Sequence, residues 1–201
     1  AAQAQLALRR ELMPEAAPAL SASGNALDVY STTQVTQGLA ELQRDFAAQD
    51  SAELLDVEQI KQRIINSLIN DGAPEKQVGG AAVDAIEVVA NLFNALLQDS
   101  ILARNAKSEL SRLQPSVHRA ALVDGEFFES TDHPVRQLIN RVSKLRDGRS
   151  EAQKQRTEQV GKLVSRVNDN FESDVGIFDD AISELDGILD EQESEYRDKV
   201  A

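Results

Sequence analysis

Residues 81–99 read AAVDAIEVVANLFNALLQD, and this stretch decides the fold class. Its apolar residues recur every three or four positions, which is the period of an α-helix. Two of its faces are apolar: the first carries Ala82, Ile86, Val89 and Phe93, and the second carries Ala81, Ala85, Val88 and Leu92. Apolar side chains on more than one face are typical of a helix that other elements cover on several sides. We therefore expect a central helix with at least three other helices around it.

Helical periodicity continues on both sides of this stretch. Apolar stripes with spacings of three and four predict helices near residues 34–46, 57–69, 104–113, 115–122 and 134–145. Pro115 and Pro134 suit the first turn of a helix, and Asp-Gly pairs at 71–72, 124–125 and 147–148 suit helix ends. No alternating strand pattern of five or more residues occurs. The sequence therefore predicts an all-α multi-helix bundle of about seven to nine helices.

The C-terminal part of the chain carries the longest continuous helical pattern. No proline follows residue 150, and an apolar seam runs at spacings of three and four from Val160 onward. The seam includes Val167, Phe171, Phe178, Ile182, Leu185 and Leu189. The pattern predicts either one helix of about 45 residues or a helical hairpin broken near residues 174–176. Because long exposed apolar stripes are rare on soluble monomers, we expect the first domain, a second copy or a protein partner to cover this interaction seam.

Composition divides the chain into three segments. Residues 1–30 combine a helical pattern at 1–12 with a stretch rich in proline, glycine and small residues, which predicts a helix fragment followed by a flexible linker. Residues 31–149 hold the predicted helical core domain. Residues 150–201 hold the long acidic C-terminal helix or hairpin.

Charge is distributed unevenly along the chain. The formal net charge is -13, which argues against nonspecific binding of nucleic acid or of anionic membranes. Within this total, residues 104–166 have a net charge of +5, whereas residues 1–103 and 167–201 have -8 and -10. The charges could simply be solvated helix faces, or the acidic C-terminal segment could dock on the basic middle. No transmembrane or signal segment is apparent, so we expect a cytoplasmic location.

Few groups are available for catalysis or metal binding. The sequence has no cysteine and only two histidines, His118 and His133, so it has no thiol nucleophile and no thiolate metal site. It also lacks a glycine-rich phosphate loop and a nucleophile elbow. The short match Arg166-x-x-Asp169 to some cyclic-dinucleotide sites can arise by chance. We therefore predict no cofactor, no metal and no cyclic-di-GMP binding by this piece of chain.

The stretch at 113–140, LQPSVHRAALVDGEFFESTDHPVRQLIN, has an unusual composition. Its polar and aromatic residues could form a structural clip that fixes the angle between two helices, or they could form a ligand patch. The residues concerned are Asp124, Phe127, Phe128, His133, Pro134, Arg136 and Asn140. As a clip, Arg136 is expected to pair with Asp124 or with a backbone carbonyl, and Phe127 or Phe128 is expected to be buried.

The same stretch carries a resemblance to a known family. The motifs are Leu113-Gln114-Pro115, Ala121-Leu122-x-Asp124, Phe127-Phe128 and His133-Pro134-x-Arg136-x-Leu138-x-Asn140. With them, the chain resembles the proteobacterial family of domain of unknown function 1631, most strongly over residues 31–145. The resemblance implies a long, mostly helical cytoplasmic protein of which this chain is a piece. Some members carry a PilZ-type cyclic-di-GMP domain elsewhere, and members are often labelled thymidine phosphorylase, a label that this strand-free sequence does not support.

Two functions from different classes fit the sequence. The first is a noncatalytic helical scaffold or protein–protein interaction module, with contacts through the C-terminal helices and a link to cyclic-di-GMP signalling through the rest of the chain. The second is a ligand-binding or enzymatic helical domain that uses Asp124, His133, Arg136 and Asn140. The lack of a nucleophile–base pair favours the first.

Overall fold

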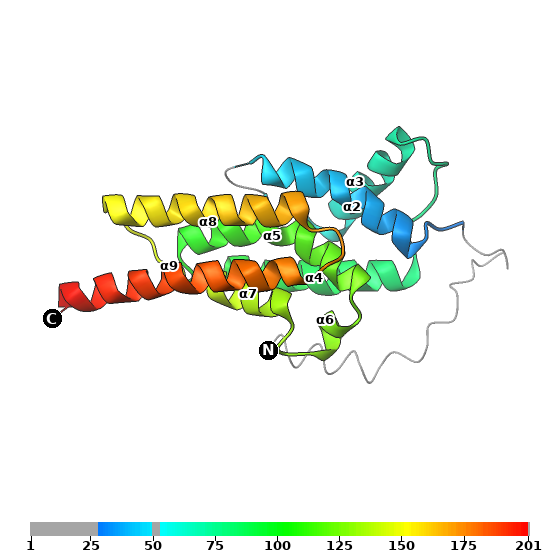
Figure 1. The fold of residues 1–201 in the computed structure, drawn as a ribbon. Coiled ribbons are helices and arrows are strands. Elements are labelled where there is room, and N and C mark those ends of the chain that lie inside the picture. The colour runs from blue at the N-terminus through cyan, green and yellow to red at the C-terminus, as the bar shows by residue number, and fades with distance from the viewer. Residues whose placement is uncertain (1–27, 50–52, 201) are drawn as a thin grey trace.

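The computed structural model describes residues 28–49 and 53–200, and these residues form eight helices and no sheet. The helices are α2 (Thr32–Ala47), α3 (Val57–Asn70), α4 (Gly80–Gln98), α5 (Arg104–Val123), α6 (Glu126–Glu129), α7 (Pro134–Val142), α8 (Glu151–Asn170) and α9 (Gly176–Val200) (Figure 1). The prediction of an all-α bundle with seven to nine helices is therefore confirmed. The predicted helix at 1–12 and most of the predicted linker lie outside the described residues.

Side chains in the flanking turns define several helix ends. Ser31 and Asp56 each accept a hydrogen bond from the N–H three positions later, and the glutamine at that position bonds back to the cap residue. These capping boxes satisfy N–H groups that a helix start leaves free. Pro134 occupies the first turn of α7, where His133 provides the cap. Gly72 ends α3 in the left-handed region, with a φ of 89°.

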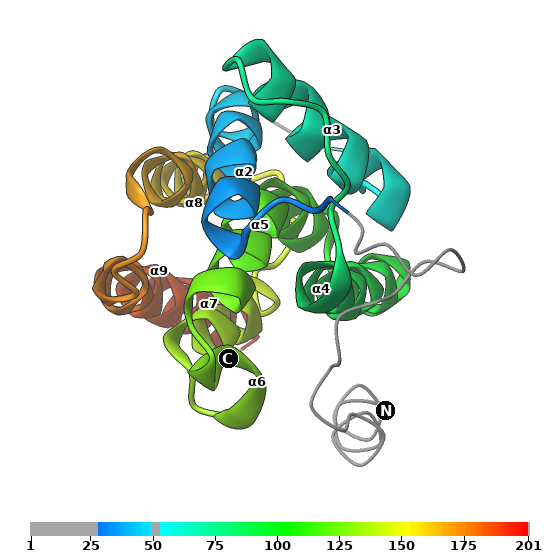
Figure 2. The same cartoon turned by 90° about the vertical axis from the view of Figure 1, so that its right-hand side faces the viewer.

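The central helix of the bundle is α5. Thirteen of its twenty residues are buried, and it contacts α2, α4, α7 and α8. Figure 2 looks along the helices and shows α5 in the middle of the fold. The expectation that residues 81–99 form the central helix is wrong. Helix α4 lies at the edge, where it contacts α5 and α3, and only its face with Ala82, Ile86, Val89 and Phe93 is buried.

Pro115 lies inside α5 and does not begin a new helix as the sequence predicts. A proline in a helix interior has no N–H to donate to the carbonyl four residues earlier, here that of Ser111. The side chain of Gln114 replaces this bond, because its Nε2 donates to Ser111 O at 2.7 Å. The same amide group binds the chain between α2 and α3, donating to Glu53 O at 3.0 Å and accepting from Leu55 N at 3.1 Å. Gln114 therefore allows the helix to continue through the proline.

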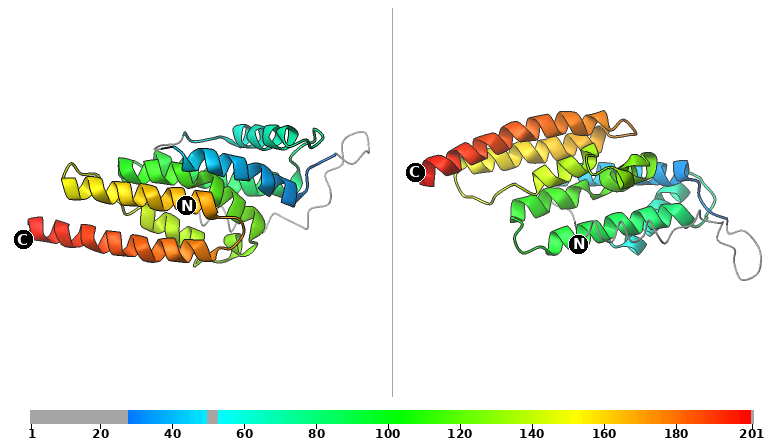
Figure 3. Two further views of the ribbon diagram at one scale, coloured as in Figure 1. Left: turned by 45° about the horizontal axis from the view of Figure 1, so that its top comes forward. Right: turned by 90° about the horizontal axis from the view of Figure 1, so that it is seen from below.

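Helices α8 and α9 form an antiparallel hairpin that breaks at residues 171–175 (Figures 1 and 3). Of the two alternatives for this segment, the hairpin is the one observed. Phe171 and Phe178 meet edge to face at the turn, with ring centroids 4.8 Å apart. The hairpin is not a separate unit, since one apolar cluster joins it to α4, α5 and α7. A second cluster joins α2, α3 and the first half of α4.

The interaction seam lies inside this protein's own core. Five of its members are buried, and Leu189 is half-buried against the same cluster: the buried ones are Val167, Phe171, Phe178, Ile182 and Leu185. Helices α2 and α5 pack against α8, and α7 packs against α9. Of the three expected covers, the first domain is the one observed, so the expectation that the seam itself meets a partner is corrected.

Charge also ties the acidic C-terminal segment to the basic middle of the chain. Arg141 Nε donates to Asp186 Oδ1 at 2.7 Å, and Arg156 and Arg166 form ion pairs with Glu195 and Glu184. The Arg141 and Arg166 pairs are accessible to solvent, and such pairs typically contribute about 0–1 kcal/mol each, whereas Arg156 is buried. Docking within the chain is therefore one use of the uneven charge, and apolar burial supplies most of the attachment.

Among the described helices, only α4 has the length and mean hydropathy of a membrane span. One third of that segment is buried inside the fold.

Candidate functional site

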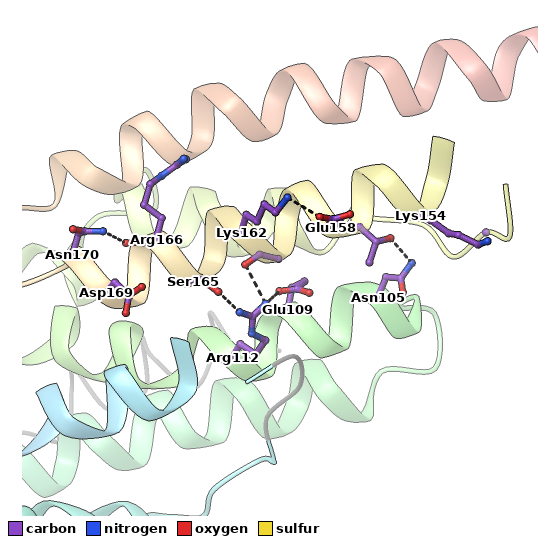
Figure 4. A pocket seen from close by; sticks show the side chains of 13 residues that line it. Asn105, Glu109, Arg112, Lys154, Glu158, Lys162, Ser165, Arg166, Asp169 and Asn170 are labelled. Atoms are coloured by element: carbon purple, nitrogen blue, oxygen red, sulfur yellow. Dashed lines mark hydrogen bonds and ion pairs between the residues drawn. The ribbon is translucent and has the colours of Figure 1, made fainter. Parts of the chain in front are cut away.

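A groove of about 840 Å³ runs between α5 and α8 (Figure 4). Charged side chains of both signs line it: Glu109, Arg112, Lys154, Glu158, Lys162, Arg166 and Asp169. Several of these side chains are already paired, for example Lys162 Nζ with Glu158 Oε1 at 2.6 Å. The groove therefore offers a polar and nearly charge-balanced surface.

The floor of the groove holds a buried ion pair. Arg112 and Glu109 are both nearly inaccessible to solvent, and Arg112 Nη1 donates to Glu109 Oε2 at 2.7 Å. The guanidinium group also donates to Gly161 O at 3.2 Å and to Ser165 Oγ. A Cβ on Gly161 would lie 3.4 Å from Arg112 Nη1, so the glycine gives the guanidinium room to reach the backbone of α8. Arg112 therefore fastens α5 to α8 from within, because two contacts of its guanidinium group, those to Gly161 and Ser165, are to α8.

A polar layer continues from Arg112 along the junction of α2, α5 and α8. Asn168 of α8 donates to Arg112 O at 2.8 Å and contacts Ser116 Oγ. Gln43 of α2 donates to the carbonyls of Asn168 and Phe171 at 3.1 and 3.0 Å, and Arg119 donates to Gln43 Oε1 at 2.9 Å. Burial lowers the pKa of Arg119. Since these buried groups satisfy one another, the layer is suited to fixing the positions of three helices.

His118 differs from the arginines of α5 because its whole polar group is buried without a hydrogen bond, whereas Arg112 and Arg119 each lack a partner only at Nε. His118 is 1% exposed, and neither ring nitrogen has a hydrogen-bond partner within the described structure. Burial lowers the pKa of His118 to about 3 because the charged imidazolium would lose its hydration. The ring is therefore neutral at physiological pH and acts as a core side chain.

Two members of the predicted clip, Asp124 and His133, form a direct pair. His133 Nε2 lies 3.2 Å from Asp124 Oδ2, and His133 Nδ1 accepts from Val135 N at 3.2 Å. Because Nδ1 is an acceptor, the proton of the neutral ring lies on Nε2 and points to the carboxylate. The histidine is buried, and the ring of Phe127 packs against it edge to face at 5.4 Å. The pair joins the end of α5 to the start of α7.

Arg136 binds the clip through a backbone carbonyl. Its Nε donates to Phe127 O at 2.8 Å, and its guanidinium group lies 5.3 Å from the centre of the Phe127 ring. Burial lowers the pKa of Arg136. Phe127 is buried and meets Phe128 edge to face, whereas Phe128 is half-buried. Asn140 is exposed on α7, away from these contacts, so the structure does not bring all four polar residues of the predicted ligand patch together.

Apolar periodicity alone could not reveal the polar layer. Its members on α5 recur at spacings of three, four and three: Glu109, Arg112, Ser116 and Arg119. This spacing is typical of one helix face. The face spans Pro115, however, where the sequence predicts a boundary between two helices. No group of three metal-ligating side chains occurs within the described part of the chain.

The fold and its polar junctions define the class of this protein. This is an all-α bundle whose buried charged groups join helices, with no nucleophile–base pair or metal cluster in the described residues. The family model described as "Protein of unknown function (DUF1631) 2nd domain" matches residues 29–174. The chain therefore belongs to the DUF1631 family, as its motifs indicated. No curated protein and no solved structure matches it.

Proposed function

We propose that this chain is a noncatalytic helical domain that binds a protein partner as part of a larger cytoplasmic protein. One observation carries the proposal: α4 lies at the edge of the fold, and the residues of its second apolar face are exposed or only half-buried. Exposed apolar faces on soluble domains are typical of protein interaction sites. The link to cyclic-di-GMP signalling rests on the resemblance alone and would act through the rest of the chain.

The polar side chains support this proposal because they bond to other groups within the fold. Arg112 pairs with Glu109, His133 pairs with Asp124, and Arg136 binds a backbone carbonyl. A catalytic group must be free to meet a substrate and must be near a second group that moves a proton. These three side chains instead hold helices together, so they suit a scaffold better than an active site.

In-cell photo-crosslinking tests the proposal on the intact protein. A photoreactive residue is placed in turn at Val88 on α4, at Lys162 on α8 and at Ser183 on α9, which sample three different surfaces. A protein crosslinked from any of these positions, at a yield well above that of an unirradiated sample, is the expected result. Absence of a protein adduct at all three positions would contradict the proposed function.

A second candidate is a small polar ligand in the groove between α5 and α8, which its volume and charged lining favour. Inorganic phosphate, ATP and free amino acids serve as probes in a thermal unfolding assay of the intact protein. A ligand of the groove raises the melting temperature of the wild type but not that of a Lys162→Glu variant. A Lys199→Glu variant, which carries the same charge change on the far end of α9, is the control.

A further inference from the structure

The second apolar face of α4 has the spacing of a helix-pairing seam. Its residues follow one another at intervals of four, three, four and three, and we call them the outer seam: Ala81, Ala85, Val88, Leu92 and Ala95. This alternation keeps one row of side chains facing a second helix, as positions a and d do in a coiled coil. Helix α4 therefore has two apolar faces, one used by the core and one with the pattern for a further helix.

The outer seam has no complete cover in the described structure. Ala81 and Ala95 are exposed, and Ala85 and Val88 are half-buried without joining either core cluster. Leu92 alone packs partly against the core. Ile101, three residues beyond the end of α4, is 89% exposed. The row is mostly alanine, so another helix backbone could approach α4 closely.

Charge next to the outer seam selects the occupant. Residues 77–103 contain three acidic side chains, Asp84, Glu87 and Asp99, and no lysine or arginine. Asp84 lies directly beside the seam, one position before Ala85. A second copy of this chain would bring the same acidic edge and a net charge of -13 to the interface, and anionic lipid would be repelled in the same way.

We infer that the outer seam of α4 binds an amphipathic helix of another protein, with small or aliphatic residues on its apolar face and lysine or arginine at its edges. The inference rests on the proposed function and names the surface and the chemistry of the partner. Apolar contact along the seam supplies affinity, and the pairing of basic edges with Asp84 and Asp99 orients the bound helix. Raising the salt concentration weakens the charge contribution and leaves the apolar contribution in place.

Crosslinking followed by identification of the crosslinked peptide tests this inference in the intact protein. The photoreactive residue stands at Val88 or at Ala95, on the outer seam, and Ser183 on α9 serves as the control position. The expected product from both seam positions is one segment of another protein that has helical apolar spacing and a net positive charge. A Val88→Asp, Leu92→Asp variant, probed at Ala95, is expected to lower the yield at least tenfold. The matched variant Ser183→Asp, Ser194→Asp, which adds the same charge on α9, leaves the yield unchanged.

Every other crosslinked product overturns the inference, and each kind of product identifies a different alternative. An adduct to residues 1–27 of the same chain means that the chain covers its own seam. An adduct to a second copy means self-association, and an adduct to lipid means a membrane contact. No adduct at the seam, or one to an acidic segment, also overturns it. If a protein partner is crosslinked only from Lys162 or Ser183, the proposed function stands and the assignment to α4 fails.

The charge argument has an independent check. Asp84→Lys and Asp99→Lys, made together, reverse the edge of the seam without changing its apolar residues. The crosslinking yield of the basic partner from Ala95 is expected to fall at least fivefold, and Asp179→Lys with Asp180→Lys on α9 provides the control with the same total charge. An equal yield in both variants would show that the acidic edge does not select the partner.

Discussion

A single buried imidazole makes this fold sensitive to acid. Burial lowers the pKa of His118 from its ordinary value of 6.5 to about 3, so the unfolded chain binds a proton that the folded chain excludes. Above pH 6.5 this difference in pKa has little effect on the free energy of unfolding. As the pH falls toward 3, it lowers the free energy of unfolding by an increasing amount. Between pH 6.5 and 4.5 this site alone is expected to lower the free energy of unfolding by about 2–3 kcal/mol.

Urea unfolding at pH 7.5, 5.5 and 4.5 measures this loss. His118→Leu removes the titrating group and keeps an apolar side chain in the core, so its free energy of unfolding is expected to fall less between pH 6.5 and 4.5 than that of the wild type. Other acid-titrating groups affect both proteins and cancel in the comparison. Parallel pH curves for the two proteins would contradict the assignment of the acid sensitivity to His118.

The pairing of Gln114 with Pro115 predicts that their substitutions are coupled. Gln114→Leu leaves Ser111 O, Glu53 O and Leu55 N without their partner, and each buried group left unpaired costs about 1–3 kcal/mol. Pro115→Ala restores an N–H that can bond Ser111 O. The cost of Gln114→Leu, measured by denaturant unfolding, is therefore expected to be about 1 kcal/mol smaller in the Pro115→Ala background. Additive effects would show that Gln114 does not serve the proline.

At the level of the helices, two glycines should respond differently to alanine. A Cβ on Gly187 of α9 would meet no atom within 4 Å, whereas a Cβ on Gly161 of α8 would lie 3.4 Å from Arg112. Gly187→Ala is expected to stabilise the protein by about 0.5–1 kcal/mol through helix propensity. Gly161→Ala is expected to stabilise the protein less, because its methyl group would lie against the guanidinium group of Arg112. The melting temperatures of the two variants test this, and equal increases would contradict it.

Arg136 connects α6 to α7, and its removal tests the strength of that connection. It bonds a carbonyl and is half-buried, so Arg136→Ala is expected to lower the free energy of unfolding by about 1–2 kcal/mol, less than for a buried pair of charges. Lysine keeps the charge but cannot reproduce the flat guanidinium over Phe127, so Arg136→Lys should recover part of the loss. Unchanged stability of both variants would contradict a role as a clip.

The positions of most helices could be predicted from the sequence, but their places in the bundle could not. Stripes of Val, Leu and Ile define a buried face for each helix, and capping residues define its start, so local residues contain that information. Which helix is central depends on partners far along the chain. Both faces of α4 look equally apolar, yet only the one with Ile86 and Phe93 meets α5.

In the candidate site, too, contacts between residues close in sequence could be predicted, and contacts between distant residues could not. His133 and Asp124 are close in sequence, so their pairing follows from local turns. The layer that joins Gln43, Ser116 and Asn168 spans 125 residues, and no local pattern indicates which polar residues meet there. Pro115 made this helix face harder to predict, because a proline usually marks a helix boundary. The compensating role of Gln114 also depends on the segment before α3, which is distant in the sequence.

At the level of the whole molecule, α9 is part of the core and not an appendage. Phe178 and Leu185 are completely buried in the cluster shared with α5 and α7. Phe178→Asp with Leu185→Asp is therefore expected to abolish cooperative folding of the described core, because two buried charges without partners exceed a typical total stability of about 5–15 kcal/mol. Circular dichroism and thermal unfolding measure this. If helices α2 to α7 still unfolded cooperatively, α9 would be an independent unit.

Helix α9 also lies beyond the residues that the family model matches, which end at 174. Its removal would nevertheless expose the apolar residues of α5 and α7. The described structure thus includes α9 in the same packed core as the matched residues.

The polar layer between α2, α5 and α8 fixes the axial register of these three helices. Purely aliphatic helix faces can slide past one another by a turn, about 5.4 Å, and still find apolar contacts. Here a slide of that size would break the bonds of Gln43, Asn168 and Arg112 together. The three helices are therefore locked along their axes. A force or signal that reaches one end of these three helices would move them together as one rigid unit. Any motion used for switching has to come from helices outside the polar layer, such as α4.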